Sequence, residues 1–285
     1  MSSHNGQGKL ESQQAGEAGR GDDKVLRLGG MALRNGLLVH GPTSWAVAAR
    51  DREGEIQVAS GPKPVLAPDL AARVPLLRGP LKLAEAFMLI PTVRLSLRSA
   101  RLPFEDVRVV GTMLAASALS RALRSEKTSA PREIAQAAIG LAPALVALSN
   151  RDLAAYHGAE HKAIGAYEAG TDPADATKEH SRCGSNLIAP MLVCSVAGQL
   201  LLDRALESPG AMARGAVGIA SVSLAAELFA WSERNPETTA ARAFRRPGHE
   251  IQRLVATKEP TPEQLEVGVA AMSEILRVEQ ANGSD

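Results

Sequence analysis

Residues 156–166 read Tyr-His-Gly-Ala-Glu-His-Lys-Ala-Ile-Gly-Ala and contain the pattern H-x-x-E-H. The pattern predicts a helix on which His157 and His161 lie one turn apart on the same face, with Glu160 beside them. The opposite face is mostly glycine and alanine, which lets a neighbouring element approach closely. We therefore expect a helix over 152–169 whose polar face lines an interior site or meets water.

Two imidazoles at this spacing can bind one divalent metal, for which zinc is the first choice, and Glu160 is placed to act as its general base. A catalytic zinc usually has three protein ligands, so another segment must supply the third. The candidates are His180 and Cys183, which form H-x-x-C, and Glu227, an acid inside an apolar stretch. Glu168 lies about 10 Å along the axis from the nearer histidine, so we expect it to support the site without binding the metal.

Each of these residues also has a structural interpretation. The helix could be a solvated one with unrelated histidines. Glu227 could form an ion pair with Arg214, and Cys183 could be a small buried residue. If the metal site exists, Tyr156, Glu168 and Arg182 are expected to surround its ligands and orient them by hydrogen bonds.

Composition narrows the class of protein. The chain has 285 residues and a net charge of +1, so no electrostatic attraction to nucleic acid is implied. Its two cysteines, Cys183 and Cys194, are typical of a reducing compartment and not of a disulfide scaffold. Residues 1–24 are polar and lack the apolar core of a signal peptide, so we predict a disordered tail there.

The segment 25–104 is predicted to hold a small β region followed by an amphipathic helix. Short apolar runs broken by turn residues indicate strands, with a hairpin across 45–59. A sheet of two or three strands is not stable alone and must pack on another element. The stretch 74–102 mixes leucines with arginines, which is typical either of a basic helix on a membrane surface or of an ordinary helix facing the core.

The segment 105–235 contains four apolar stretches, at about 107–122, 133–149, 186–202 and 213–231. Each is near the lower length limit for crossing a hydrocarbon core of about 30 Å, so a soluble helical bundle and a four-span membrane protein are both compatible with them. Four spans would put both termini and the H-x-x-E-H helix on one side. That side has more Arg and Lys near the span ends, which indicates the cytoplasm.

The last segment, 236–285, is predicted to carry an amphipathic helix over 262–280. Thr261 and Gln264 form a capping box, Pro262 occupies the first helical position, and apolar residues follow at helical spacing. We expect this helix to be soluble and to pack on the amino-terminal sheet.

These segments resemble the YqhQ-like bacterial proteins, the family of domain of unknown function 1385, described as predicted metal-dependent membrane enzymes. Residues 156–162 are identical to the family motif YHGAEHK. Further resemblances are Gly29–Pro42 to GGQAVxEGVMMRGP, Trp45–Ala48 to WAVAVR, Pro75–Gly79 to PxxRG, His180–Gly184 to HPRCGTSF, and segments between Pro247 and Val267 to PGLWLQRLTTREPDDEQLEVA. Glu227 falls where the family has a glutamate near its last span.

The resemblance implies a multipass protein of the bacterial inner membrane, but it implies no substrate. The chain departs from the family in its opening motif, where Met31 and Asn35 replace a glutamine and a glutamate, and after the RCG residues, where an aromatic is lost. A divergent member of reduced activity is therefore possible.

The sequence as a whole favours an α+β, mainly helical protein with a small β region, about four short membrane helices, a cytoplasmic metal-motif helix and an amphipathic carboxy-terminal helix. The expected function is that of a zinc-like metal-dependent hydrolase in contact with membrane lipid. The alternatives are a non-enzymatic membrane scaffold or assembly factor with a buried polar cluster, and a metal that only holds helices together.

Overall fold

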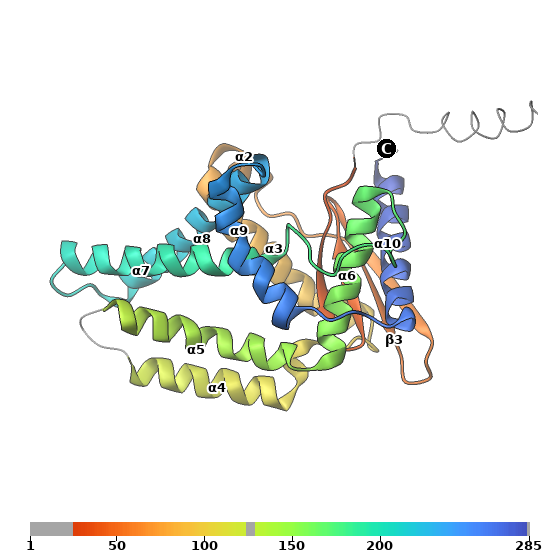
Figure 1. The fold of residues 1–285 in the computed structure, drawn as a ribbon, viewed down its shortest axis with the longest axis horizontal. Helices are drawn as coiled ribbons and strands as arrows, with labels where there is room; N and C mark the ends of the chain where they lie inside the picture. The colour runs from red at the N-terminus through yellow and green to blue at the C-terminus, as the bar shows by residue number, and fades with distance from the viewer. Residues whose placement is uncertain (1–24, 124–128, 284–285) are drawn as a thin grey trace, which may run out of the picture.

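A computed structural model describes residues 25–123 and 129–283 (Figure 1). The tail predicted over 1–24 lies outside the described residues. The described chain has two parts: a head, in which a sheet packs against α6 and α10, and a set of long helices that project from it to one side (Figure 1). The chain is mainly helical with a small sheet near its amino terminus, as the sequence predicted.

The sheet is an antiparallel meander of four strands in chain order: β1 (Gly29–Leu33), β2 (Gly36–His40), β3 (Ser44–Arg50) and β4 (Ile56–Pro62). The predicted hairpin is formed by β3 and β4. Successive side chains of a strand point to opposite faces, and here both faces are buried. Leu37 and Val39 face α6 and α10, whereas Leu38 and Trp45 face Leu89 and its neighbours on α3.

Two helices follow the sheet, α2 (Pro68–Arg73) and α3 (Pro75–Ser96). Glu85, Leu89 and Val93 recur every four residues along α3, so they form one face, and all three are buried. The outer face keeps large apolar side chains exposed, among them Phe87 and Leu95. The expectation of a core-facing helix is therefore confirmed, and α3 also carries an apolar outer surface. Its placement on a membrane stays a prediction.

Four helices form the projecting part: α4 (Val107–Ala122), α5 (Ala130–Leu148), α7 (Ile188–Ala205) and α8 (Ala211–Arg234). They pair as two hairpins, α4 with α5 and α7 with α8 (Figure 1). Within residues 25–123 and 129–283, two segments are long and apolar enough to cross a membrane, Gly184–Ala205 and Ala211–Arg234, and α5 with α6 gives a third if this bent pair is one span. The four predicted helices are present, but α4 has only 16 residues. It is about 24 Å long and does not meet the length of a span.

The H-x-x-E-H motif lies on α6 (Arg151–Ala169), which meets α5 at 90° and lies against the sheet instead of continuing the projecting part (Figure 1). Asn150 caps its first turn, since its side-chain oxygen accepts from the backbone N–H groups of Asp152 and Leu153. Gly170 ends it in the left-handed conformation, at φ 67°. The predicted helix over 152–169 is thus confirmed.

The remaining elements are three short turns and two longer helices. They are two short 3₁₀ helices, η1 (Pro103–Glu105) and η2 (Gly184–Leu187), then α9 (Thr239–Ile251), the π-helical turn η3 (Gln252–Ala256) and α10 (Pro262–Asn282). The predicted capping box of Thr261 and Gln264 starts α10. Val267, Ala271 and Ile275 of α10 pack against the sheet, as expected.

Candidate metal centre

The small residues of α6 let other segments come very near its axis. A Cβ at Gly158 would lie 2.1 Å from the carbonyl oxygen of Lys258, and a Cβ at Gly268 of α10 would lie 3.2 Å from the carbonyl oxygen of Ala159. The N–H of Lys258 donates to the carbonyl oxygen of Ala154 at 2.9 Å. The segment after η3 is therefore held against α6 by backbone contact.

This packing orients both histidines. Nδ1 of His157 lies 2.8 Å from the carbonyl oxygen of Ala256, and Nδ1 of His161 lies 2.7 Å from that of Lys178. A carbonyl oxygen only accepts, so both Nδ1 atoms must carry the proton. Each Nε2 is then the ring nitrogen without a backbone partner, and it can bind a metal when the ring is neutral. Backbone acceptors of this kind fix the tautomer and ring orientation of histidines that bind metals.

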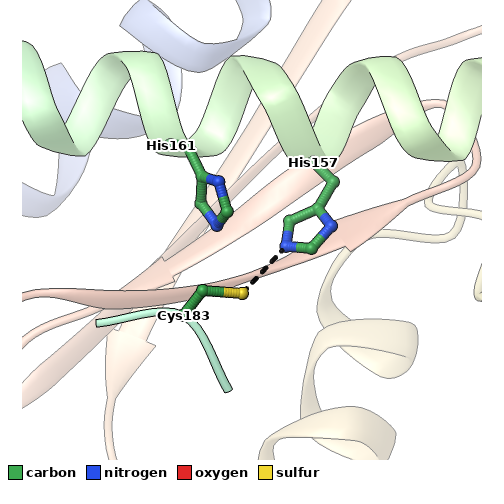
Figure 2. A group of neighbouring side chains, drawn as sticks. All are labelled: His157, His161 and Cys183. Carbon is green, nitrogen blue, oxygen red and sulfur yellow. Dashed lines mark hydrogen bonds between the residues drawn. The ribbon is translucent and has the colours of Figure 1, made fainter. Parts of the chain in front are cut away.

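Cys183 brings a third donor from the loop before η2. Its Sγ lies 3.6 Å from Nε2 of His157, and the three donor atoms of His157, His161 and Cys183 lie within 4.8 Å of one another (Figure 2). Figure 2 shows both rings extending from one side of α6 toward the sulfur. Cys183 is a free cysteine.

The donor set fits a zinc-like ion. Zinc binds histidine nitrogen at about 2.0–2.1 Å and cysteine sulfur at about 2.3 Å, so two such ligands at tetrahedral angles are about 3.6 Å apart. The separation between Sγ of Cys183 and Nε2 of His157 is also 3.6 Å. Three protein ligands are typical of catalytic zinc, which keeps its fourth position open.

Burial tunes the titratable groups of this cluster. It lowers the pKa of His161 to about 3, so the imidazole is neutral and available as a ligand at neutral pH. It raises the pKa of the Cys183 thiol, and a bound cation would favour the thiolate instead. It also raises the pKa of Glu160 to about 7, where a carboxyl group can both accept and donate a proton.

Glu160 is buried against the first strand. A Cβ at Gly30 would lie 2.6 Å from Oε1 of Glu160, so only glycine leaves room for the carboxylate at this position of β1. The Gly29–Gly30 pair of the opening motif thus has a physical reason. The position of Glu160 depends on the sheet as well as on its own helix.

These residues line one cavity of about 700 Å³ between the head and the base of the projecting helices. Its walls include His157, Glu160, His161 and Cys183, and Glu227 contributes from α8. The volume is in the usual range for small-molecule sites, about 300–1,000 Å³.

His180 lies near the histidine pair but is engaged elsewhere. Its ring centroid is 5.7 Å from that of His161, yet its Nε2 lies 3.1 Å from Oε2 of Glu168 and its Nδ1 accepts from the N–H of Arg182. Arg182 also pairs with Glu168. The three-donor group among the described residues therefore includes Cys183 and neither His180 nor Glu227.

The residues expected to orient the ligands divide into two groups. Glu168 and Arg182 hold His180 beside the histidine pair. Tyr156 instead packs in the core between the sheet, α6 and α10, and burial raises its pKa. The sequence did not predict this core position of Tyr156. Helical spacing shows which face of α6 a residue lies on, but not which other element covers that face.

Sequence reasoning missed the basic side chains that share the cavity. Lys63, Arg78 and Lys82 line it together with His40. His40 and Arg78 lie within the family-like motifs Gly29–Pro42 and Pro75–Gly79, but Lys63 and Lys82 lie in none. All four residues are distant in sequence from α6, so the motifs do not reveal that they share its cavity. The Arg-rich, leucine-rich composition of the stretch 74–102 was the available signal.

Comparison with known proteins places this arrangement in a family. Residues 145–278 match the model described as "Protein of unknown function (DUF1385)". This range runs from the end of α5 into α10 and includes the three donors and Glu160. Residues 145–278 belong to the DUF1385 family. The motifs at 29–79 that resemble the family's opening segments lie before the matched range.

The chain is also similar to the uncharacterized protein YqhQ of Bacillus subtilis (strain 168), with 29% identity over 129 residues. The alignment covers 44% of this chain and 40% of YqhQ, so the chain matches less than half the length of this relative. No solved structure matches the chain.

Proposed function

We propose that the chain is a membrane-anchored, metal-dependent hydrolase. His157, His161 and Cys183 hold a zinc-like divalent ion, and Glu160 is the acid and base of the reaction. The observation that carries this proposal is the set of three converging donors whose two imidazoles are fixed, by backbone carbonyls, with Nε2 toward the sulfur.

A zinc-like ion with an open position would supply Lewis-acid chemistry. The chain's own contribution is proton transfer and exclusion of water. Glu160 accepts a proton from the attacking water while the oxygen of that water bonds to the acyl or phosphoryl centre of the substrate. It then gives that proton to the leaving group as the substrate bond breaks. A pKa of about 7 suits both steps at neutral pH.

The arrangement supports an enzyme better than a structural metal. Structural zinc sites are closed by four protein ligands, whereas the described residues bring three together. A cavity of about 700 Å³ beside the donors offers room for a substrate. A scaffold protein would require neither the cavity nor two imidazoles aimed at a thiol.

We place the head at the cytoplasmic face of the bacterial inner membrane, with α7 and α8 crossing the bilayer. The two candidate spans are joined at the far end of the projecting part, so the head and both ends of the pair lie on one side (Figure 1). Two free cysteines suit a reducing compartment. The excess of Arg and Lys near the head side of the spans supports the same orientation.

Metal analysis of the detergent-purified full chain tests the site. We expect about one zinc equivalent in the native protein and loss of it in His157→Ala, His161→Ala and Cys183→Ala. Cys194→Ala is the matched control, because Cys194 lies on α7 outside the donor group, and it should keep the metal. A native protein without metal, or equal metal in Cys183→Ala and Cys194→Ala, would contradict the proposal.

Hydrolysis of p-nitrophenyl esters and phosphodiesters tests the reaction separately. Glu160→Gln should keep the zinc and lose at least about 100-fold in rate, the lower end for a general acid–base group. Unchanged hydrolysis in that variant would leave a metal centre but refute the role of Glu160.

A further inference from the structure

The cavity that holds the candidate metal centre has two kinds of wall. One part is apolar and is formed by α3 and by the two candidate spans, through Leu83, Leu187, Met191, Val222 and Phe229. The other part is basic. Four cations line the cavity, Lys63, Arg78, Lys82 and Arg182, against the carboxylates of Glu160 and Glu227.

The basic groups near α3 are only partly neutralised. Lys82 and Lys63 share a single buried carboxylate, that of Glu85, at 2.8 and 3.5 Å. Arg78 donates through Nε to the carbonyl oxygen of Ala71 and has no carboxylate partner among the described residues. Three cations therefore face one acid at this side of the cavity. A guanidinium with free donors beside an ammonium suits a phosphate group.

The surroundings of this basic side favour a ligand that comes from a membrane. Arg78 and Lys82 are exposed on α3, one turn apart. The same helix exposes Leu76, Leu83 and Phe87, at 53%, 46% and 62% of their surface. A helix with basic and large apolar side chains on its open surface is typical of an element that lies in a bilayer interface.

We propose that the cavity binds one anionic amphiphile of the phospholipid class. Its phosphate lies at Arg78 and Lys82, with Lys63 behind them, and its chain lies along the apolar wall between α3 and α8. This inference rests on the proposed function in naming the substrate class, but binding of the lipid does not require the metal.

Binding is measured with the full chain in neutral detergent micelles, by the change in tryptophan or labelled-lipid fluorescence on titration. Three probes separate the parts of the ligand: dioleoyl phosphatidic acid, dioleoylglycerol and inorganic phosphate. We expect saturable binding of one phosphatidic acid per chain, at least 10-fold weaker binding of dioleoylglycerol, and no saturation by millimolar phosphate. Equal binding of the neutral lipid would overturn the phosphate site, and tight binding of free phosphate would overturn the lipid-derived ligand.

Variants locate the site. Arg78→Gln with Lys82→Gln should weaken phosphatidic acid binding at least 10-fold. Arg73→Gln with Arg94→Gln removes two exposed charges from the same region without touching the cavity, so it controls for general attraction to an anionic micelle and should change binding less than twofold. Equal losses in the two double variants would overturn the proposal.

A second route does not depend on folding of the basic-site variant. Ala230 lines the cavity, so Ala230→Phe should exclude the chain of the lipid and lower its affinity at least 10-fold. Native mass spectrometry of the unaltered protein should show one retained anionic phospholipid, and its absence would count against the proposal.

The two proposals fail in different ways. Removal of zinc from the native protein with a chelator should leave phosphatidic acid binding within twofold of that of the zinc-loaded protein. Lipid binding without zinc in the native chain would refute only the metal centre. Zinc binding without lipid selectivity would refute only the substrate class.

Discussion

Gly158→Ala is the sharpest test of how the fold builds the site. The added Cβ would lie 2.1 Å from the carbonyl oxygen of Lys258, which is backbone and cannot rotate away. The segment after η3 must then move outward from α6. That segment begins directly after Ala256, the last residue of η3, whose carbonyl oxygen orients the ring of His157. One methyl group is thus expected to reduce both stability and metal affinity.

The size of the effect follows from three terms. Overpacking at a rigid contact costs about 1–3 kcal/mol. Loss of the hydrogen bond from Lys258 to Ala154 costs about 1 kcal/mol more. Replacing glycine by alanine inside a helix stabilises the folded protein by about 1 kcal/mol, because alanine has the higher helix propensity. The net loss is about 2 kcal/mol, or about 4–8 °C in Tm for a chain of this size. Zinc affinity should fall about 10-fold or more, as for other losses of a group that orients a ligand.

Gly165→Ala provides the matched control on the same helix. There the nearest atom to the added Cβ is Cδ2 of His180 at 3.8 Å, an ordinary contact, so only the helix term remains. This variant should be as stable as the native protein or about 0.5–1 kcal/mol more stable. Thermal unfolding in detergent and zinc titration give both readouts. A Gly158→Ala protein with native Tm, or equal losses at both glycines, would refute the reasoning.

Three other changes test separate parts of the argument. Glu160→Gln tests burial: between about pH 4.5 and 7 the folded chain keeps a proton on Glu160 that the unfolded chain has released, so the metal-free native protein loses stability as pH rises through this window. Glu160→Gln has no such proton, so its unfolding free energy relative to that of the native protein should rise from about pH 5 to pH 8. Urea unfolding measures this difference at each pH. A difference that does not change with pH would contradict a buried carboxyl group. Glu279→Gln should cost about 2 kcal/mol in urea unfolding, because this carboxylate accepts from two backbone N–H groups and a hydroxyl at residues 43–44. The exposed Glu266→Gln control should cost less than about 0.5 kcal/mol, and similar costs for the two variants would argue against the buried cap. Asn35→Ala removes bonds to the backbone of Arg50, Ser99 and Arg101, so it should lower Tm without lowering zinc content, and a loss of zinc would show that position 35 has a role in the site.

Local pattern predicted the parts of the molecule that depend on neighbours in sequence. The period of a helix is enough to put His157 and His161 on one face, and the capping box is enough to start α10 at Pro262. The hairpin of β3 and β4 follows from the turn at 51–54 in the same way. Each of these predictions needs only a few consecutive residues, and each agrees with the structure.

The third donor depends on contacts that no local pattern encodes. His180 and Cys183 were equal candidates by residue type, and their positions in one short loop do not separate them. The difference arises because Glu168 and Arg182 occupy both ring nitrogens of His180, whereas Sγ of Cys183 remains directed at His157. Choosing between them required the path of the loop over the end of α6.

Membrane crossing was predictable only in part for a similar reason. Apolar composition located all four projecting helices and most of their length, and α4 covers the predicted stretch 107–122. Composition did not show which of the four helices are long enough to be spans, and the 16 residues of α4 are too few. The bend of 90° between α5 and α6 turns the chain from the projecting part into the head. A hydropathy pattern identifies the apolar stretch before such a bend, but it does not show the direction in which the chain continues after the bend.

The glycines of the family-like motifs explain why fold and site are difficult to separate in this chain. Gly30 makes room for Glu160, and Gly158 admits the segment that directly follows the acceptor for His157. Gly248 is in contact with the backbone of Asn186, just after the cysteine, where an added Cβ would lie 2.6 Å from its N atom. Three segments distant in sequence are thus brought to the histidines through contacts that exclude a Cβ. A side chain at any of these glycines should therefore displace a functional group by an ångström or more while most of the core remains packed, so that the site is lost before the fold.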